Sequence, residues 1–147
     1  MNPNGKVPAI SDNGFNLSES HTILRYLAIS KNCADHWYPA DPKNRAKVDE
    51  YLDWHHNNIR LGAGGYFFRK YVSGLTGKPA PDSMISESYD YIHRSLLFIE
   101  KFWFSHKSKF MFGEMMTIAD LSLACELATL FQIDYDLKAF PNTKFWL

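Results

Sequence analysis

Two short motifs near the N-terminus place chemically useful groups at a strand edge and at a helix start. Lys6-Val7-Pro8 precedes a short apolar stretch, and Glu19-Ser20 stands where a helical pattern begins. A helix N-terminus has unpaired N–H groups and a positive dipole end, and the Ser20 hydroxyl adds a donor. If the Val7-Pro8 bond is cis, the Val7 backbone faces outward, toward a peptide-like ligand. The motifs predict a site for a small-molecule carboxylate; an ordinary hairpin and capped helix are the alternative.

Other candidate groups have simpler structural explanations. His55 and His56 are adjacent, so on a helix they point about 100° apart, and no metal site is expected. Residues 62–65 (Gly-Ala-Gly-Gly) follow a helix and lack the ending of a phosphate loop, which favours a kink or a close backbone approach to a ligand. Asp120 follows Thr117 by three residues, as in a capping box, which explains it better than catalysis does. The remaining histidines are expected to be buried and hydrogen-bonded.

The first 32 residues predict a β-hairpin followed by a helix. Two short apolar segments, 7–10 and 15–17, are joined by Asp12-Asn13-Gly14, a typical tight-turn sequence. Apolar residues one helical turn apart then predict an amphipathic helix that ends near Lys31-Asn32. The chain therefore passes directly from a strand into the helix that carries Ser20 near its start.

The rest of the chain predicts a helical domain. Residues 35–42 contain two prolines and form a linker. Apolar spacing predicts helices over 44–61, 67–75, 83–105 and 118–131. The glycines of 62–65 should break or bend the first helix, the third should pack along its whole length, and the fourth is apolar enough to lie at the centre of a bundle. We divide the chain into a partial domain at 1–32, a linker at 33–43 and a helical domain at 44–147.

Composition excludes several classes of protein. The 147 residues are 46% apolar and 16% aromatic, which is typical of a globular fold with a substantial core. Sixteen basic and sixteen acidic residues cancel, so we expect neither a nucleic-acid nor a membrane partner. Cys33 and Cys125 form no disulfide or metal motif, and no signal peptide is recognisable, which predicts a cytoplasmic protein.

Motifs from both halves of the chain, in the same order, resemble the theta class of glutathione transferases, closest to its plant members. They are Lys6-Val7-Pro8-Ala9-Ile10, Glu19-Ser20-His21, Ala34-Asp35-His36-Trp37-Tyr38-Pro39, Leu52-Asp53-Trp54-His55-His56 and Ile118-Ala119-Asp120-Leu121. The resemblance implies a mostly α fold in which a partial thioredoxin-like unit, a β-hairpin plus a helix, precedes an all-helical domain. The implied reaction is detoxification, by attack of the glutathione thiolate on an electrophile or by reduction of an organic peroxide.

The resemblance also implies roles for four residues, beside which Arg60 is a separate candidate from its position before the glycines. Lys6 and the Val7 backbone, beside a cis-Pro8, would hold the glycyl and cysteinyl parts of glutathione. Glu19 and Ser20 would hold its γ-glutamyl end. Glutathione is the co-substrate, and no metal is implied. Arg60 could face the second substrate, a small electrophile, although a solvated arginine is the alternative.

The resemblance further implies that parts of the family's site lie outside this sequence. The serine that stabilises the thiolate belongs to a segment upstream of Met1, and a covering segment would follow Leu147. We therefore expect a chain that is truncated at both ends and has weak or no transferase activity alone. No catalytic residue can be named in it. The oligomeric state stays open, with a homodimer as one possibility. The location also stays open, since the peroxisome or the nucleus could replace the cytoplasm. The alternatives are a non-catalytic interaction module of glutathione-transferase type and a fragment without function.

Overall fold

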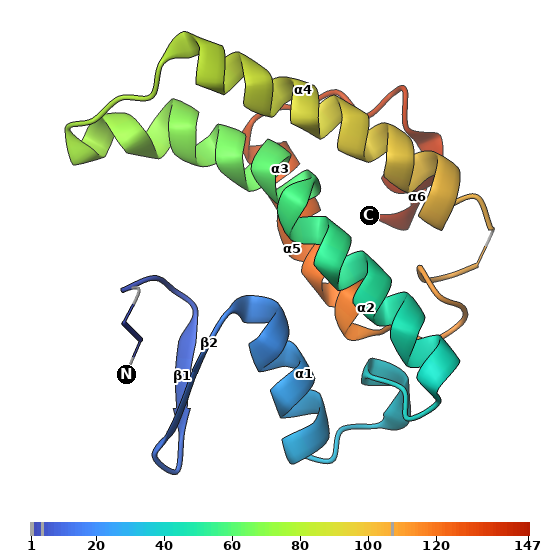
Figure 1. Cartoon of the computed structure of the whole chain (residues 1–147). Helices are drawn as coiled ribbons and strands as arrows, with labels where there is room; N and C mark the ends of the chain where they lie inside the picture. The colour runs from blue at the N-terminus through green and yellow to red at the C-terminus, as the bar shows by residue number, and fades with distance from the viewer. Residues whose placement is uncertain (1, 4, 107) are drawn as a thin grey trace.

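The computed structural model describes residues 2–3, 5–106 and 108–147. Within these residues the fold is mostly helical, with a small hairpin and one helix set beside a helical body (Figure 1). The elements are β1 Ala9–Asp12, β2 Phe15–Ser18, α1 Ser20–Ser30, α2 Pro42–Asn57, α3 Ile59–Phe67, α4 Asp82–Phe98, α5 Ile118–Gln132 and α6 Pro141–Trp146. Wider π-helical turns at Phe68–Val72 and Ile99–Trp103 extend α3 and α4. The mostly α fold class is as predicted.

The N-terminal hairpin forms as the sequence predicts. β1 and β2 are antiparallel, with Asp12 opposite Phe15, and Asn13-Gly14 turns the chain with positive φ at both residues. The Asp12 carboxylate accepts hydrogen bonds from the Tyr26 hydroxyl at 2.9 Å and from Lys31 Nζ at 2.7 Å. Both donors belong to or follow α1, so the turn of the hairpin is fastened to the helix that it precedes.

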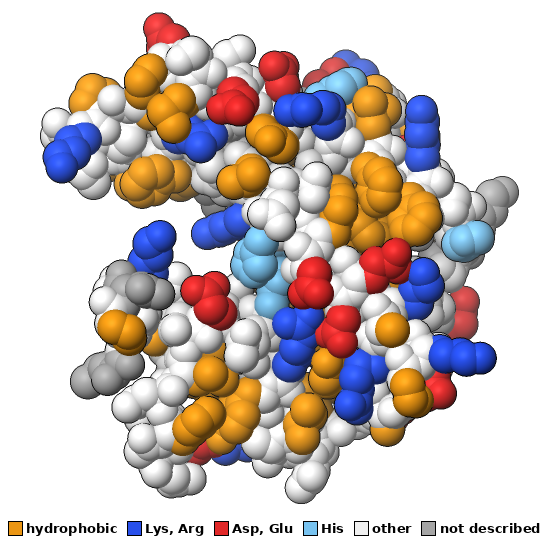
Figure 2. Space-filling view, in the orientation of Figure 1, with side chains coloured by type: hydrophobic (Ala, Val, Ile, Leu, Met, Phe, Trp, Pro, Cys, Tyr) orange, Lys and Arg blue, Asp and Glu red, His pale blue; other side chains and the backbone are white. Residues whose placement is uncertain are grey.

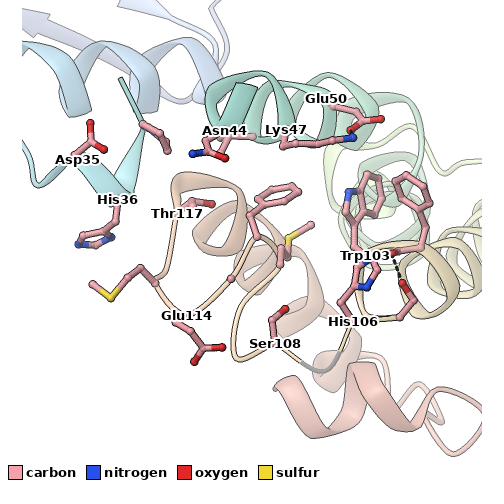
Figure 3. A pocket seen from close by; sticks show the side chains of 18 residues that line it. Asp35, His36, Asn44, Lys47, Glu50, Trp103, His106, Ser108, Glu114 and Thr117 are labelled. Atoms are coloured by element: carbon pink, nitrogen blue, oxygen red, sulfur yellow. Dashed lines mark hydrogen bonds and ion pairs between the residues drawn. The ribbon is translucent and has the colours of Figure 1, made fainter. Parts of the chain in front are cut away.

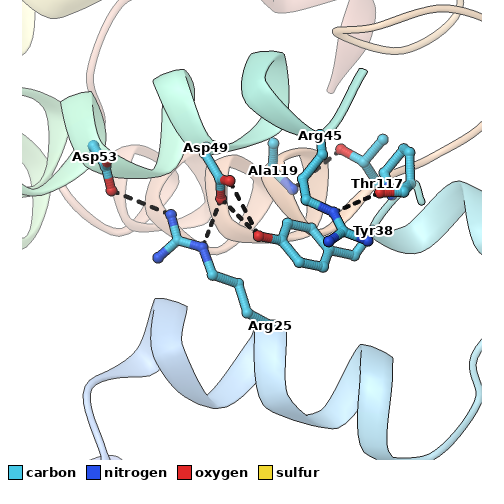
Figure 4. Close-up of polar contacts among 8 residues, drawn as sticks. Arg25, Tyr38, Arg45, Asp49, Asp53, Thr117 and Ala119 are labelled. Atoms are coloured by element: carbon cyan, nitrogen blue, oxygen red, sulfur yellow. Dashed lines mark hydrogen bonds and ion pairs between the residues drawn. The ribbon is translucent and has the colours of Figure 1, made fainter. Parts of the chain in front are cut away.

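Polar contacts orient α1 and the predicted linker against α2 (Figure 4). Arg25 Nε donates to Asp49 at 2.7 Å, and its NH2 donates to Asp53 at 3.1 Å. The Tyr38 hydroxyl lies 3.1 Å from both Asp49 oxygens, and the Arg45 guanidinium lies over the Tyr38 ring at 4.8 Å. Pairs near the surface contribute about 0.2–1 kcal/mol each, so these partly buried contacts set orientation more than stability.

The core is built around α5, as its apolar sequence predicts. Fully buried side chains from α2, α3 and α4 pack with those of α5, and they include Val48, Tyr51, Leu52, Ile59, Ile92, Leu96, Leu123, Leu127 and Leu130. Among the large apolar residues of α5, Leu121 and Phe131 are exposed. One side of the central helix therefore faces away from the core, toward the hairpin unit at Leu121.

The predicted glycine break is wrong. The first long helix ends at Asn57, the backbone leaves the helical region at Asn58, and Gly62, Gly64 and Gly65 all lie inside α3. A Cβ atom on Gly62 would lie 2.6 Å from the backbone nitrogen of Ile92 in α4. The glycine therefore permits close approach of two helices, not a kink or a contact with a ligand.

The helix predicted over 83–105 also packs over less than its whole length. Ile92, Leu96, Ile99 and Trp103 are buried, but Tyr89 is 46% exposed. Figure 1 shows why: α3, with its extension, and the first half of α4 project beyond α5 as a pair. The apolar stripe packs there mainly against α3, with the Tyr89 ring 5.6 Å from Tyr66 and 5.3 Å from Tyr135, and it meets the core farther along.

Candidate functional site

A cavity of about 550 Å³ lies between the hairpin unit and the helical body. Its lining includes the predicted residues Lys6, Val7, Pro8, Glu19, Ser20 and Arg60. Arg60 belongs to α3, and the rest of the opposite side comes from α2 and α5, through His55, His56, Leu121, Ser122, Cys125 and Glu126. Figure 2 shows a notch between the two parts, with histidine and basic side chains at its inner end. The volume is in the range of small-molecule sites, about 300–1,000 Å³.

The strand side of the cavity presents backbone. Val7 lies just before β1, and its side chain is 92% exposed. The Val7–Pro8 peptide bond is cis, as expected. Lys6 adds a cation at the same edge, where its carbonyl accepts from the Asn2 side-chain amide. This edge can therefore meet an extended ligand with backbone groups and one positive charge.

The helix side of the cavity presents the start of α1. The helix begins at Ser20, and the Glu19 side chain makes no capping hydrogen bond to its first turn. Because the first N–H groups of a helix have no intrahelical partner, those of this turn are suited to an anion. Glu19 has φ 74°, which is strained for a residue with a side chain, and such strain is typical of ligand sites.

Three histidines form the inner wall of the cavity. His21 Nε2 lies 2.7 Å from Ser122 Oγ, and the His21 ring lies 4.1 Å from the His56 ring. His55 Nδ1 lies 2.9 Å from the Tyr51 hydroxyl. The histidines were expected to be buried and hydrogen-bonded, which is confirmed for His21 and His55 but wrong for His56, His93 and His106, which are exposed. The meeting of three histidines at the site was not foreseen. No group of three or more potential metal ligands occurs among the described residues.

The buried His21 predicts that stability falls in mild acid. Burial, together with His55 and His56, lowers the pKa of His21 from 6.5 to about 3. Between pH 6.5 and about 3, His21 is therefore protonated in the unfolded chain and neutral in the folded chain. The free energy of unfolding should fall by at most about 1.4 kcal/mol per pH unit below pH 6.5 from this residue.

The measurement for this prediction is urea unfolding between pH 7 and pH 5, above the range in which most carboxylates titrate. The His21→Asn variant should lose part of the slope with pH. An identical slope in both proteins would contradict the assignment to His21.

Arg60 lines the cavity, and its side chain is 59% exposed. Its NH1 donates to Glu126 Oε1 at 2.5 Å, and His55 Nε2 lies 3.7 Å from the same oxygen. Burial acts to raise the pKa of Glu126, but His55 and Arg60 outweigh it and lower that pKa. Arg60 is therefore partly solvated and also paired with a buried carboxylate. Glu126 was missed, although a carboxylate inside the most apolar helix was a usable signal.

A larger cavity of about 740 Å³ lies beside the start of α2 and the loop before α5 (Figure 3). Several of its polar groups are already used within the protein. Lys47 Nζ contacts Glu50 at 2.8 Å, His36 Nδ1 lies 2.6 Å from the Met116 carbonyl, and Ser105 donates to the Phe102 carbonyl. The smaller cavity gathers the predicted groups and is the stronger candidate.

Sequence and structure comparisons agree with the geometry. Residues 1–29 match the family model for the glutathione S-transferase N-terminal domain, and residues 65–147 match the model for the C-terminal domain. Glutathione S-transferase T1 of Arabidopsis thaliana is 44% identical over 136 residues, which are 91% of this chain and 56% of that protein. Glutathione S-transferase theta-1 of Gallus gallus is 42% identical over 123 residues, 83% of this chain and 47% of that protein.

A solved structure extends the likeness to three dimensions. The human theta-class enzyme, in complex with the glutathione conjugate of 1-menaphthyl sulfate, superposes with a TM-score of 0.88 at 32% identity. The match covers 99% of this chain and 59% of that one, and the chain spans about half the length of the relatives it matches. None of the described helices is long and apolar enough to cross a membrane. The chain belongs to the glutathione S-transferase family and, within it, to the theta class.

Proposed function

We propose that the 550 Å³ cavity binds glutathione, for conjugation to small electrophiles or for reduction of organic peroxides. The observation that carries the proposal is the meeting of Lys6, Val7, Glu19 and Ser20, from two sequence motifs, at one cavity. In the same proposal residues 1–32 are a glutathione-binding unit, 33–43 a linker and 44–147 a helical domain. The proposal also includes a homodimer, as in the family, and a cytoplasmic location.

The chemistry of the lining matches the groups of glutathione. The γ-glutamyl carboxylate meets the N–H groups and the hydroxyl at Ser20, and Glu19 takes the neighbouring amine. The cysteinyl part runs along the Val7 backbone, and the glycyl carboxylate lies near Lys6. The thiol then points toward the side of the cavity that carries Arg60.

These groups bind and orient glutathione, and we assign none of them to bond-making. Holding two reactants in place can supply a large part of a rate enhancement. Lowering the pKa of the thiol is a separate, electrostatic task. The reaction itself is attack of the thiolate sulfur on an electrophilic carbon, with the leaving group departing.

The test is binding of S-methylglutathione, a non-reactive analogue, measured by titration calorimetry. Replacing Ser20 by Ala should weaken binding about tenfold, because one donor to a charged carboxylate is worth about 1.5 kcal/mol. The matched control is Ser11→Ala, an exposed serine of β1 outside the cavity, which should bind as the wild type does. Equal loss in both variants would contradict the site.

A second measurement on the same proteins locates the ligand. Cys125 lines the cavity, whereas Cys33 is an exposed cysteine outside its lining. Bound S-methylglutathione should slow alkylation of Cys125 and leave that of Cys33 unchanged. If the wild type bound no analogue and protected neither thiol, the proposal would fail, and a non-catalytic interaction module would be the better interpretation.

A further inference from the structure

The side of the cavity proposed for the second substrate contains one strong cation, Arg60, whose position depends on two residues that carry no assigned role. One is Gly64, four residues farther along α3, and the other is Glu126 on α5. Arginine is long and flexible, and fixing it loses side-chain entropy of about 2 kcal/mol. Neighbouring residues must therefore hold the guanidinium if it is to keep one orientation.

Gly64 provides the space. A Cβ atom on Gly64 would lie 2.9 Å from Arg60 NH1, 3.1 Å from Cζ and 3.2 Å from Cδ. These are side-chain atoms, so the guanidinium lies across the bare backbone of α3 one turn ahead. Any side chain at position 64 must push the guanidinium away. The neighbouring Gly65 differs, since the nearest atoms to its Cβ would be at ordinary contact distance, 3.6 Å.

Glu126 provides the anchor. The residue is only 4% exposed, and its Oε1 accepts from Arg60 NH1 at 2.5 Å. His55 at 3.7 Å supports the same oxygen from behind. A carboxylate fixed inside α5 thus holds one edge of the guanidinium, and 59% of the Arg60 side chain stays exposed beside the cavity.

We infer that Gly64 and Glu126 are positioning residues that hold the Arg60 guanidinium toward the second-substrate side of the cavity. The inference rests on the proposed function, because that side is defined by the bound glutathione. Glu126 has two separable effects: it fixes Arg60, and its negative charge weakens the pull of Arg60 on an anionic ligand. Gly64 has the steric effect alone.

The test compares two ligands that differ by one carboxylate at the sulfur, S-methylglutathione and S-carboxymethylglutathione. The measured quantity is the ratio of their Kd values, which cancels general damage to the glutathione site. In the wild type Arg60 should favour the carboxymethyl conjugate about fivefold, the upper range for a partly exposed pair. Arg60→Gln should abolish this preference.

The positioning variants should move the ratio in opposite directions. Gly64→Ala displaces the guanidinium and should bring the ratio close to that of Arg60→Gln. The matched control, Gly65→Ala, should keep the wild-type ratio. Glu126→Gln keeps an acceptor for Arg60 but removes the charge, so the preference for the anionic conjugate should increase by a further two- to fivefold.

Three results would overturn the inference. They are a wild-type ratio in Gly64→Ala, the same loss in Gly65→Ala as in Gly64→Ala, and a decreased preference in Glu126→Gln. Each of these requires that the wild type binds both conjugates, so each leaves the proposed function intact. Failure of the wild type to bind either conjugate would instead remove the proposed function, and the inference with it.

Discussion

Replacing Asp120 by Ala should lower the free energy of unfolding by about 3 kcal/mol. Asp120 is 1% exposed, and its carboxylate accepts from the Met111 N–H at 2.8 Å, the Thr117 N–H at 2.9 Å and the Thr117 hydroxyl at 2.9 Å. The Thr117 side chain in turn accepts from the backbone N–H of Asp120, which completes the predicted capping box, and from the Ala119 N–H at 3.1 Å. The variant loses the Asp120 half of the capping box and leaves the buried N–H groups of Met111 and Thr117 unpaired, and each effect costs about 1–2 kcal/mol.

The measurement is urea unfolding at pH 7, followed by far-ultraviolet circular dichroism. The control is Asp82→Ala, an exposed acid in the first turn of α4 at a helix start without a side-chain cap, which should change stability by about 0.5 kcal/mol or less. A loss in Asp120→Ala as small as in the control would show that the capping box does not hold α5. The result bears on the site because α5 carries Ser122, Cys125 and Glu126.

The structural features that could be predicted from the sequence are those that depend on residues close together in the chain. The hairpin turn at Asn13-Gly14, the start of α1 at Ser20 and the Thr117–Asp120 box each depend on residues within one turn of one another. In such cases backbone geometry leaves few alternatives, so local chemistry and global structure agree. The five residues proposed for glutathione also came from short motifs, which family resemblance connected to one ligand, whereas Arg60 was proposed separately for the second substrate.

Contacts between residues that are far apart in the sequence could not be predicted in the same way. His21 and Ser122 are separated by 101 positions and meet only because α1 packs beside α5. Likewise, nothing local to Arg60 indicates that its partner is Glu126, 66 positions away. The inner wall of the cavity is a product of tertiary packing, so sequence periodicity shows its members as ordinary helix residues.

The glycines of α3 show how a correct observation can suggest the wrong element. Gly62, Gly64 and Gly65 have low helix propensity, which predicted a break, yet all three are helical. At two of these positions the missing side chain leaves space for another group. At Gly62 this group is the backbone of α4, and at Gly64 it is the Arg60 guanidinium. Tertiary contacts therefore outweighed a propensity difference of about 1 kcal/mol per residue.

Gly62→Ala should be the second strongly destabilising change, by about 2 kcal/mol. The added Cβ would lie 2.6 Å from Ile92 N, 2.9 Å from Ile92 Cα and 3.0 Å from the Tyr91 carbonyl carbon. All three atoms belong to the α4 backbone, so no side-chain rotation can relieve the overlap and the two helices must separate. Overpacking of this kind costs about 1–3 kcal/mol, and backbone contacts belong at its upper end. The better helix propensity of Ala returns about 1 kcal/mol.

Gly65→Ala is the matched control, because it makes the same chemical change on the same helix, with nearest contacts at 3.6 Å. It should raise the free energy of unfolding by up to about 1 kcal/mol, so the two variants should differ in sign. A stabilised Gly62→Ala protein would contradict the close crossing of α3 and α4. Because Arg60 precedes Gly62 by two residues, separating the helices should also move the guanidinium. Gly62→Ala should therefore reduce the preference for S-carboxymethylglutathione while Gly65→Ala keeps it.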